Sequence, residues 1–398
     1  MIIQPIWQSL LSDSQRRALS PGVPVPLPER PDVLIVGGGG VGLCIAYFLA
    51  KASVGEVLVV EQGDLASGAS GANGGGIFAG QQRANFPAEY RELGLASREL
   101  YAQWAEEGWA ELQWRRSGSL AIQASDFSGS MAEYVRRERD IGRAAEHVTG
   151  GRLRELESVL APDVTEGVYY PDDGRLNPLG TAISLAAEIQ KLGVTIATGV
   201  RVDDIKSNGG RVVQVLTTAG EVQPGTLVIT TGSAAGKLGR QLGATIPMQP
   251  AKGQLLATEP LPWRMNTNVV GEYLLSQLPG GELISGGNIE LGSESTEPSD
   301  EIAAQITTAA RRTIPALKDE PFVRTWTGLR PHTPDEMPII DRLPHLGNAF
   351  VAAGHFTKGV LMAPITGRLL AEWITTGRPS IDLDFLRLDR FDAGDASR

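Results

Sequence analysis

A glycine-rich turn lies between an apolar strand and an apolar helix near the start of the chain, in "DVLIVGGGGVGLCIAYFLA", residues 32–50. Gly37, Gly39 and Gly42 have G-x-G-x-x-G spacing, which permits a tight turn, close approach of the backbone to a pyrophosphate, and close packing of helix on strand. The free N–H groups at the start of the helix would favour the phosphates. The pattern therefore predicts a strand–turn–helix unit that binds a dinucleotide.

The glycine spacing alone is weak support, because the chain contains 48 glycines. A second apolar strand, "EVLVVE", strengthens it by ending in Glu61, nineteen residues after Gly42. A carboxylate at this place accepts hydrogen bonds from ribose hydroxyls and would repel the 2′-phosphate of NADP. We therefore expect an ADP-containing dinucleotide, and a purely structural glycine turn is the alternative.

Two further segments indicate a flavin. "GDLASGASGANGGGI", Gly63 to Ile77, has five glycines between Gly68 and Gly76, which suits backbone lying against a flat ligand; a flexible surface loop is the alternative. "AFVAAGHFTKGVLMAPITGRLLAEWI", from Ala349, has again the pattern of strand, glycine turn and helix. A second helix N-terminus would stabilise the negative charge of a reduced flavin. The two ends of the chain are thus expected to meet on one cofactor.

Composition excludes several classes of protein. The chain has 398 residues, which is enough for two domains, and its formal charge of −10 argues against a nucleic-acid partner. The single cysteine, Cys44, excludes an intrachain disulfide framework and suits a reducing compartment. No apolar run is long enough to span a membrane, no secretory signal is evident, and the four histidines have no metal-binding spacing. These features predict a cytoplasmic protein without a metal site.

The first 30 residues form a predicted N-terminal arm. "IWQSLLSDSQRRAL" has the pattern of one short amphipathic helix, and the prolines of "PGVPVPLPERP" favour an extended segment after it. The arm either lies on its own globule or docks a partner subunit or a membrane surface.

The chain resembles a family of flavoproteins. "VLIVGGGGVG", the carboxylate of Glu61, "GASGANGGGI", "GLRPHTPDEMPIID" and "AAGHFTKGVLMAP", in this order, are similar to the D-amino-acid oxidase superfamily, in its glycine oxidase and sarcosine oxidase branch. The resemblance covers roughly residues 32–391. It implies an α/β fold of mixed α+β type, in which an FAD domain of the glutathione-reductase type stands beside a substrate domain with a large antiparallel sheet covered by helices.

The resemblance also implies a division of the chain. The expected parts are an arm at 1–30, a discontinuous FAD domain at 31–85, 150–245 and 325–391, a substrate domain at 86–149 and 246–324, and a tail at 392–398.

The family's chemistry is FAD-dependent oxidation of the carbon–nitrogen bond of an amino acid. Hydride passes to flavin N5, and the resulting imine is hydrolysed to an oxo-acid and an amine or ammonia. In glycine oxidases the arginine of a "GLRP" segment binds the substrate carboxylate, so the resemblance assigns this role to Arg330, whose guanidinium can donate two parallel hydrogen bonds. The alternative is an internal salt bridge to Asp335 or Glu336. Tyr273 is expected near the same carboxylate, or else in the core.

Departures from both branches bear on the cofactor and the substrate. The flavin-linking cysteine of sarcosine oxidases would fall at Gly328, so FAD is expected to be non-covalent, and their carboxylate-binding lysine would fall at Leu361. An active-site arginine of glycine oxidases is replaced by Thr357, with Lys358 beside it, and Asn288 stands where a hydrophobic side chain would line the pocket. A more polar pocket favours a larger or hydroxylated substrate.

The candidate catalytic residues are Arg330, Tyr273, Asn288 and Lys358. The candidate cofactor-binding residues are Gly37, Gly39, Gly40, Val41, Gly42, Glu61, Gln62, Ser67, Ala69, Ser70, Asn73, Gly74, Gly75, Val202, Thr231, Gly232, Gly328, Arg330, Gly354, His355, Thr357, Lys358, Gly359 and Val360. His355 would pack beside the flavin or serve in structural packing.

Substrate, electron acceptor and assembly stay open. Glycine, a D-amino acid and a secondary amine acid are all candidate substrates, and the electron acceptor is oxygen, a quinone or a partner protein. One alternative is the flavin subunit of a hetero-oligomeric D-amino acid, hydroxyproline or opine-type dehydrogenase; a homo-oligomer is a further alternative. A flavin monooxygenase fits less well, because its usual "GD" pair is replaced by Gly354-His355.

Overall fold

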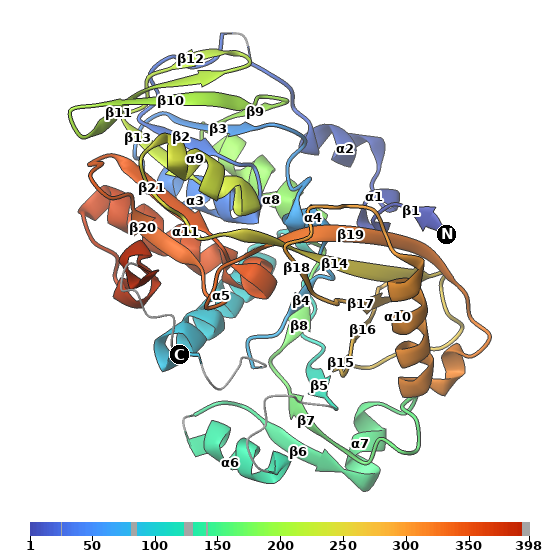
Figure 1. Ribbon diagram of the computed structural model, residues 1–398. Coiled ribbons are helices and arrows are strands. Elements are labelled where there is room, and N and C mark those ends of the chain that lie inside the picture. The colour runs from blue at the N-terminus through green and yellow to red at the C-terminus, as the bar shows by residue number, and fades with distance from the viewer. Residues whose placement is uncertain (25, 81–85, 123–129, 141, 392–398) are drawn as a thin grey trace.

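The computed structural model describes the chain except for residues 25, 81–85, 123–129, 141 and 392–398, so the predicted tail lies outside the described residues. Two large sheets dominate the molecule, one in its upper half and one in its lower half in Figure 1. Helices lie against both sheets, and the predicted mixed α/β fold is confirmed.

The first sheet has six strands in the order β20-β21-β13-β2-β3-β9. Their bounds are Ile339–Arg342 (β20), Ala349–Ala353 (β21), Thr226–Ile229 (β13), Val33–Val36 (β2), Val57–Glu61 (β3) and Thr195–Thr198 (β9). All neighbouring pairs are parallel except β20 with β21. The inner strands are apolar along their whole length and fully buried, as expected of a parallel sheet covered on both faces.

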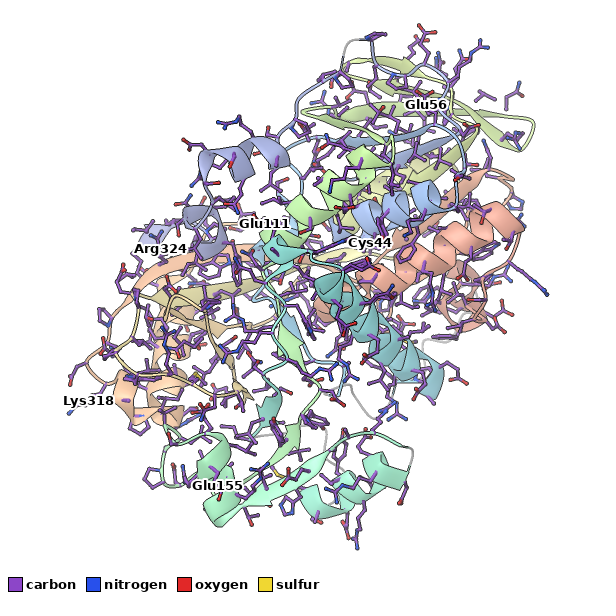
Figure 2. All side chains as sticks on the ribbon, turned by 180° about the vertical axis from the view of Figure 1, so that it is seen from behind. Cys44, Glu56, Glu111, Glu155, Lys318 and Arg324 are labelled. Atoms are coloured by element: carbon purple, nitrogen blue, oxygen red, sulfur yellow. The ribbon has the colours of Figure 1, made fainter. Side chains whose placement is uncertain are left out.

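Three long helices pack around this sheet: α3 (Gly40–Lys51), α8 (Pro178–Lys191) and α11 (Gly359–Thr376). Helices α3 and α11 lie side by side, although they are more than 300 residues apart in sequence. Cys44, labelled in Figure 2, is fully buried inside α3. The N-terminus of α8 is capped as predicted, because Asn177 Oδ1 accepts from the backbone N–H groups of Leu179 and Gly180 at 3.1 and 3.0 Å.

The second sheet has ten strands, nine of them in the order β1-β19-β14-β17-β16-β15-β5-β7-β6, with β18 paired to β14. Their bounds are Ile2–Ile3 (β1), Phe322–His332 (β19), Gln249–Thr258 (β14), Leu283–Gly286 (β17), Leu274–Gln277 (β16), Asn268–Val270 (β15), Ser119–Ala121 (β5), Glu166–Tyr170 (β7), Glu146–Thr149 (β6) and Glu290–Leu291 (β18). The antiparallel pair β14–β19 is the longest, running from Gln249↔His332 to Thr258↔Phe322. Helix α10 (Asp300–Thr313), capped by the side chain of Ser299, packs against β14 and β17 of this sheet.

Smaller elements connect the two sheets. They are α4 (Ala69–Ala72), α5 (Ala88–Glu106), α6 (Met131–Asp140), α7 (Gly150–Leu156), α9 (Ala235–Gln241), the hairpin strands β4 (Gly76–Ile77) and β8 (Gly174–Arg175), and a small sheet of β10 (Val202–Asn208), β11 (Arg211–Thr217) and β12 (Gly220–Val222). Strand β7 pairs in the ten-stranded sheet, although its residues fall within the segment assigned to the FAD domain. The division into domains itself stays a prediction.

The N-terminal arm differs from the single helix that was predicted. It contains two short helices, α1 (Ile6–Ser9) and α2 (Asp13–Leu19), because Ser12 interrupts the helical run and caps α2 through a reciprocal pair of hydrogen bonds with Gln15. Strand β1 pairs in parallel with β19, Ile2 beside Arg324, which is labelled in Figure 2. Since Ile6 and Trp7 are buried, the arm lies on the chain's own globule, one of its two expected placements.

Within the described residues, no helix is long and apolar enough to cross a membrane.

Candidate functional site

The glycine turn after β2 has the backbone that the sequence predicts. Gly37 has φ +117°, a conformation that L side chains rarely adopt. A Cβ on Gly42 would lie 2.1 Å from the carbonyl oxygen of Gly37, so only glycine lets helix α3 begin this close to the strand. Gly39 is the N-cap of α3, and the backbone N–H groups of the first turn follow it. The turn and the helix start therefore form the phosphate-binding geometry that the fingerprint implied.

Glu61 lies at the end of β3, beside the same turn. Its Oε2 accepts from the backbone N–H of Gly38 at 2.8 Å, and its Oε1 accepts from that of Gly63 at 2.8 Å. These two bonds hold the carboxylate next to the glycine turn, where a ribose would meet it. Farther along the sheet, Val202 begins β10, and Gly232 has φ +55° in the turn after β13.

The small-residue segment is anchored at several points. Ser70 Oγ accepts from the backbone N–H of Gly40 at 2.9 Å, which ties the segment to the start of α3. Trp326 Nε1 donates to the carbonyl of Ala72 at 2.8 Å, and Trp7 Nε1 donates to that of Asn73 at 2.8 Å. Because both indoles are buried, these bonds fix the backbone of the segment. The alternative of a flexible surface loop is therefore wrong.

The turn between β21 and α11 is strained. Gly354 has φ +82°, and Phe356, a bulky residue, has φ +45°. His355 between them is buried, forms a 3.0 Å hydrogen bond through Nε2 with Thr366 Oγ1 of α11, and has its pKa lowered to about 3 by burial. A neutral imidazole that bonds to α11 holds the turn against that helix.

The starts of α3 and α11 meet at one cavity of about 310 Å³, at whose wall Gly40 and Ser70 face Gly359 and Val360. Tyr101 of α5 closes one side, and its hydroxyl donates to the carbonyl of Val360 at 2.7 Å. Two helix N-termini at one cavity, with a carboxylate at the end of β3, suit the pyrophosphate and ribose of an ADP-containing cofactor. The residues present therefore fit FAD.

The remaining cofactor candidates lie around these elements. Val41 is in the first turn of α3, Ala69 begins α4, Gly74 and Gly75 follow Asn73, Thr231 precedes Gly232, Lys358 ends the short 3₁₀ turn before α11, and Gln62, Ser67 and Thr357 are exposed.

Arg330 lies near the end of β19, opposite Ala251 of β14. It shares a face of the strand with Gly328 and Trp326, since residues two apart on a strand point the same way. That face is turned toward α4, because Trp326 bonds to Ala72 and a Cβ on Gly328 would lie 2.8 Å from Ala72 Cβ. Arg330 thus stands on the side of the sheet that carries the small-residue segment.

The guanidinium of Arg330 is held by a single hydrogen bond, from Nη1 to the backbone carbonyl of Asn288 at 2.9 Å. Burial lowers its pKa to about 10. No described carboxylate forms an ion pair with it, and Asp335 pairs instead with Arg390 Nε at 2.7 Å. The alternative of an internal salt bridge to Asp335 or Glu336 is therefore not what the structure contains.

Gly253 provides the space for this guanidinium. It lies opposite Gly328 on β14, and a Cβ at Gly253 would lie 2.0 Å from Arg330 Nη1. The absence of a side chain there lets Arg330 lie along the strand with its other N–H groups unbonded to the chain. Sequence reasoning missed Gly253, because "AKGQLLATE" gives no sign of what faces its glycine.

Two of the candidate catalytic side chains do not meet Arg330. Asn288 contacts it through its backbone carbonyl, while both atoms of its side-chain amide bond elsewhere, to Gln254 N and to Glu290. Tyr273 precedes β16 and packs against the apolar cluster that contains Leu275. The expectations that Asn288 lines the pocket with its side chain and that Tyr273 hydrogen-bonds near the arginine thus find no contact within the described residues.

Asp173 is a further buried ionisable group that the sequence did not point to. It is fully buried, and burial raises its pKa to about 6. Hydrogen bonds from Ser119 Oγ at 2.6 Å and Gly80 N at 2.9 Å, and the positive charges of Arg98 and Lys358, oppose the rise. Lys358 of the glycine turn before α11 therefore acts electrostatically on a carboxyl group of the second sheet.

Within the described ranges, no group of three His, Cys, Asp or Glu residues is placed to hold a metal ion.

Comparison with known proteins agrees with this geometry. Glycine oxidase from Geobacillus kaustophilus is 29% identical over 378 residues, which are 92% of this chain and 98% of that protein. The crystal structure of the glycine oxidase from Geobacillus kaustophilus has a TM-score of 0.83 at 28% identity and covers 91% of this chain and 99% of its own. L-proline dehydrogenase from P. horikoshii has a TM-score of 0.84 at 26% identity, covering 93% of this chain and all of its own.

The family model described as "DAO: FAD dependent oxidoreductase" matches residues 32–373. This range contains the glycine turn, Glu61, the small-residue segment, Arg330 and the second helix start at α11. The predictions of an FAD cofactor and of an oxidoreductase of this superfamily are confirmed. The chain belongs to the DAO family of FAD-dependent oxidoreductases.

Proposed function

We propose that this FAD-dependent oxidoreductase oxidises the carbon–nitrogen bond of a small amino acid whose carboxylate binds Arg330. The observation that carries the proposal is a partly buried guanidinium, without an ion-pair partner among the described residues, on the face of β19 that is turned toward α4. A desolvated cation in such a place is stabilised most by an anionic ligand.

Arg330 would position the substrate. Its bond to the Asn288 carbonyl uses Nη1, so the edge formed by Nε and Nη2 is left for a carboxylate, which can accept two parallel hydrogen bonds there. The carboxylate is fixed in orientation as well as in place, and the adjacent Cα–N bond is presented to the cofactor side.

FAD, when bound, supplies the acceptor for the two electrons that leave the Cα–N bond. Loss of a hydride and of the amine proton gives an imine, and water then converts it to an oxo-acid and ammonia or an amine. His355 is kept neutral by burial, so it contributes no charge to this side of the site at neutral pH.

The relatives support a small substrate. Glycine oxidases cover nearly the whole chain, and an L-proline dehydrogenase has the same fold at a similar level of identity. Glycine, D-amino acids and cyclic secondary amine acids are therefore the substrates to test. Oxygen, a quinone and a partner protein remain the candidate electron acceptors.

The test is an anaerobic titration of the holoenzyme with glycine, sarcosine, D-amino acids, D-hydroxyproline and L-proline, in which flavin bleaching is followed. For a substrate that bleaches the flavin, Arg330→Met is expected to lower kcat/KM by roughly 10²- to 10³-fold, the range for removing one partner of a buried charge pair. The matched control is Arg312→Met, which removes an arginine that pairs with Glu272 on the surface. Turnover by Arg330→Met close to wild type would refute the proposed clamp.

A further inference from the structure

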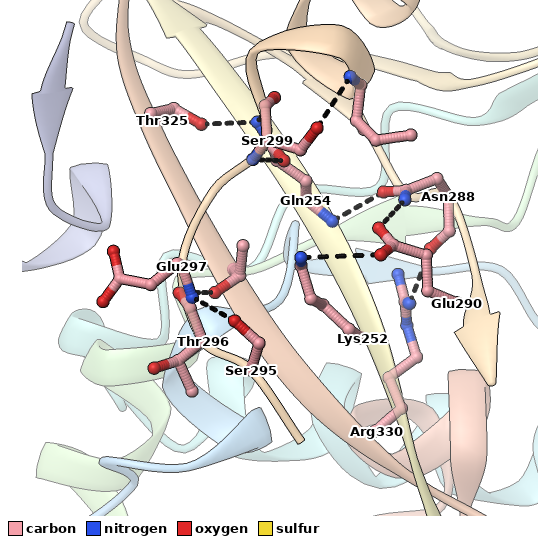
Figure 3. A network of polar contacts seen from close by, with 12 residues as sticks. Lys252, Gln254, Asn288, Glu290, Ser295, Thr296, Glu297, Ser299, Thr325 and Arg330 are labelled. Carbon is pink, nitrogen blue, oxygen red and sulfur yellow. Dashed lines mark hydrogen bonds and ion pairs between the residues drawn. The ribbon is translucent and has the colours of Figure 1, made fainter. Parts of the chain in front are cut away.

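We infer that Glu290 and Lys252 are positioning residues for the arginine clamp, and that they act through the backbone carbonyl of Asn288 (Figure 3). The inference rests on the proposed role of Arg330. It adds residues that do not touch the substrate but determine where the guanidinium stands and what charge surrounds it.

The turn after β17 places Asn288. Gly286 and Gly287 have φ +136° and +111°, and a Cβ on Gly286 would lie 2.4 Å from the carbonyl oxygen of Gln254. The backbone N–H of Gly287 donates to that same carbonyl at 2.9 Å. The chain can therefore turn this closely over β14 only with glycines at both positions.

Asn288 is then fixed through both ends of its side chain. Its Oδ1 accepts from the backbone N–H of Gln254 at 2.7 Å, and its Nδ2 donates to Glu290 Oε1 at 2.8 Å. With the side chain held, the peptide plane is held too, and the Asn288 carbonyl points at Arg330 Nη1 at 2.9 Å. The position of the guanidinium thus depends on the amide of Asn288.

Glu290 anchors this arrangement to β14. Its two oxygens have different partners: Oε1 accepts from Asn288, and Oε2 lies 3.5 Å from Lys252 Nζ. Lys252 pairs with Glu290 in the register of β14 and β18, and it is only 6% exposed. A lysine buried to this extent is tolerated because it is paired, and in return it keeps the glutamate in one orientation.

The pair also determines the charge around the clamp. Without Lys252, the carboxylate of Glu290 would stand uncompensated two residues from the carbonyl that holds Arg330. Its field would oppose a substrate carboxylate at the guanidinium. The neutral pair leaves the positive charge of Arg330 available to an anionic ligand, which favours amino acids over simple amines.

The test exchanges donor and acceptor between the two side chains. Asn288→Asp places two carboxylates together and removes the Nδ2 donor, so the carbonyl is no longer held. The double variant Asn288→Asp/Glu290→Gln restores the bond in the opposite sense, because the new amide donates to the new carboxylate, which still accepts from Gln254 N. Holoenzyme variants are titrated with glycolate, a carboxylate ligand without an amine, and the Kd is read from the flavin absorbance change.

Asn288→Asp is expected to raise the Kd of glycolate by about one to two orders of magnitude, and the double variant to recover to within about fivefold of wild type, as coupled neighbours do. Lys252→Met, whose glutamate partner can still reach solvent, is expected to raise the Kd by about tenfold with FAD content unchanged. Glu272→Gln, which breaks a surface pair with Arg312, is the control and is expected to bind glycolate like wild type.

Three outcomes distinguish the possibilities. Wild-type binding by both Asn288→Asp and Lys252→Met, or failure of the double variant to recover while Lys252→Met binds like wild type, would overturn the inference. Weakened binding by Arg330→Met together with such results would leave the clamp standing and remove only its positioning residues. Wild-type glycolate binding by Arg330→Met would instead remove the proposed function on which the inference rests.

Discussion

Gly253→Ala tests the geometry of the site with the smallest change that the chain allows. The added Cβ would lie 2.0 Å from Arg330 Nη1, against 3.4 Å for an ordinary contact, so the guanidinium has to retreat by about 1.4 Å, the difference between the two. A retreat of this size breaks the 2.9 Å bond to the Asn288 carbonyl. Because a misplacement of about 1 Å can cost 10²-fold, kcat/KM for the amino acid is expected to fall by roughly 10- to 100-fold.

Stability is expected to change much less than activity. The clash is with the far end of a long side chain, which can swing away, and Gly253 has no positive φ that alanine would strain. The melting temperature and the FAD content should therefore stay near wild type. The assay is steady-state kinetics on the substrate identified by flavin bleaching, together with the Kd of glycolate.

Gly151→Ala is the matched control. Gly151 lies in α7 with no heavy atom within 4 Å of the added Cβ, and alanine in a helix is expected to be neutral or to stabilise by about 0.5–1 kcal/mol. If Gly253→Ala kept both kcat/KM and glycolate affinity, the guanidinium would not work from the position seen here. A loss of FAD or of folding in Gly253→Ala would show that the glycine serves the sheet and not the clamp.

Three further predictions concern the cofactor and a buried acid. Glu61→Ala removes a charged acceptor of ribose hydroxyls and is expected to weaken FAD by roughly 1.5–3 kcal/mol, or about one to two orders of magnitude in Kd, which titration of the apoprotein measures; unchanged affinity would mean that the fingerprint has been misread. Since Gly328 stands at the linking position of sarcosine oxidases, acid precipitation should release all the flavin, and colour in the pellet would contradict non-covalent binding. Asp173 has its pKa raised from 3.8 to about 6, so it binds its proton more tightly in the folded state, and its contribution to stability is lost as pH rises from about 4 to 6. Asp173→Asn should flatten the dependence of the melting temperature on pH in that window, by an amount corresponding to roughly 3 kcal/mol; an unchanged profile would place the titration elsewhere.

The sequence predicts well those features that depend on neighbouring residues. The glycine turn before α3, the position of Glu61 beside it, and the Asn177 cap of α8 each involve residues close together along the chain or at the ends of adjacent strands. Local backbone sterics and strand order determine these features, so a pattern of residue types is enough to place them.

The features that escaped prediction depend on contacts between distant segments. The position of Arg330 depends on a carbonyl 42 residues away, at Asn288, and on the space left by Gly253. Asp173 is buried by contacts with Gly80 and Ser119, which no local pattern shows. Tyr273 turned to the apolar cluster because it directly precedes β16, where the alternation of side chains is not set by the strand alone.

The N-terminal arm has a consequence for the order in which the molecule can be assembled. Ile2 pairs with Arg324, and the indole of Trp7 bonds to the carbonyl of Asn73 in the segment that lines the cofactor side. The strand that receives the arm is separated from it by most of the chain, so this pairing closes a very long loop and has to wait until the last part of the polypeptide has left the ribosome. The segment made first is thus among the last to reach its place, and the flavin-binding backbone gains its final support only when the whole chain is present.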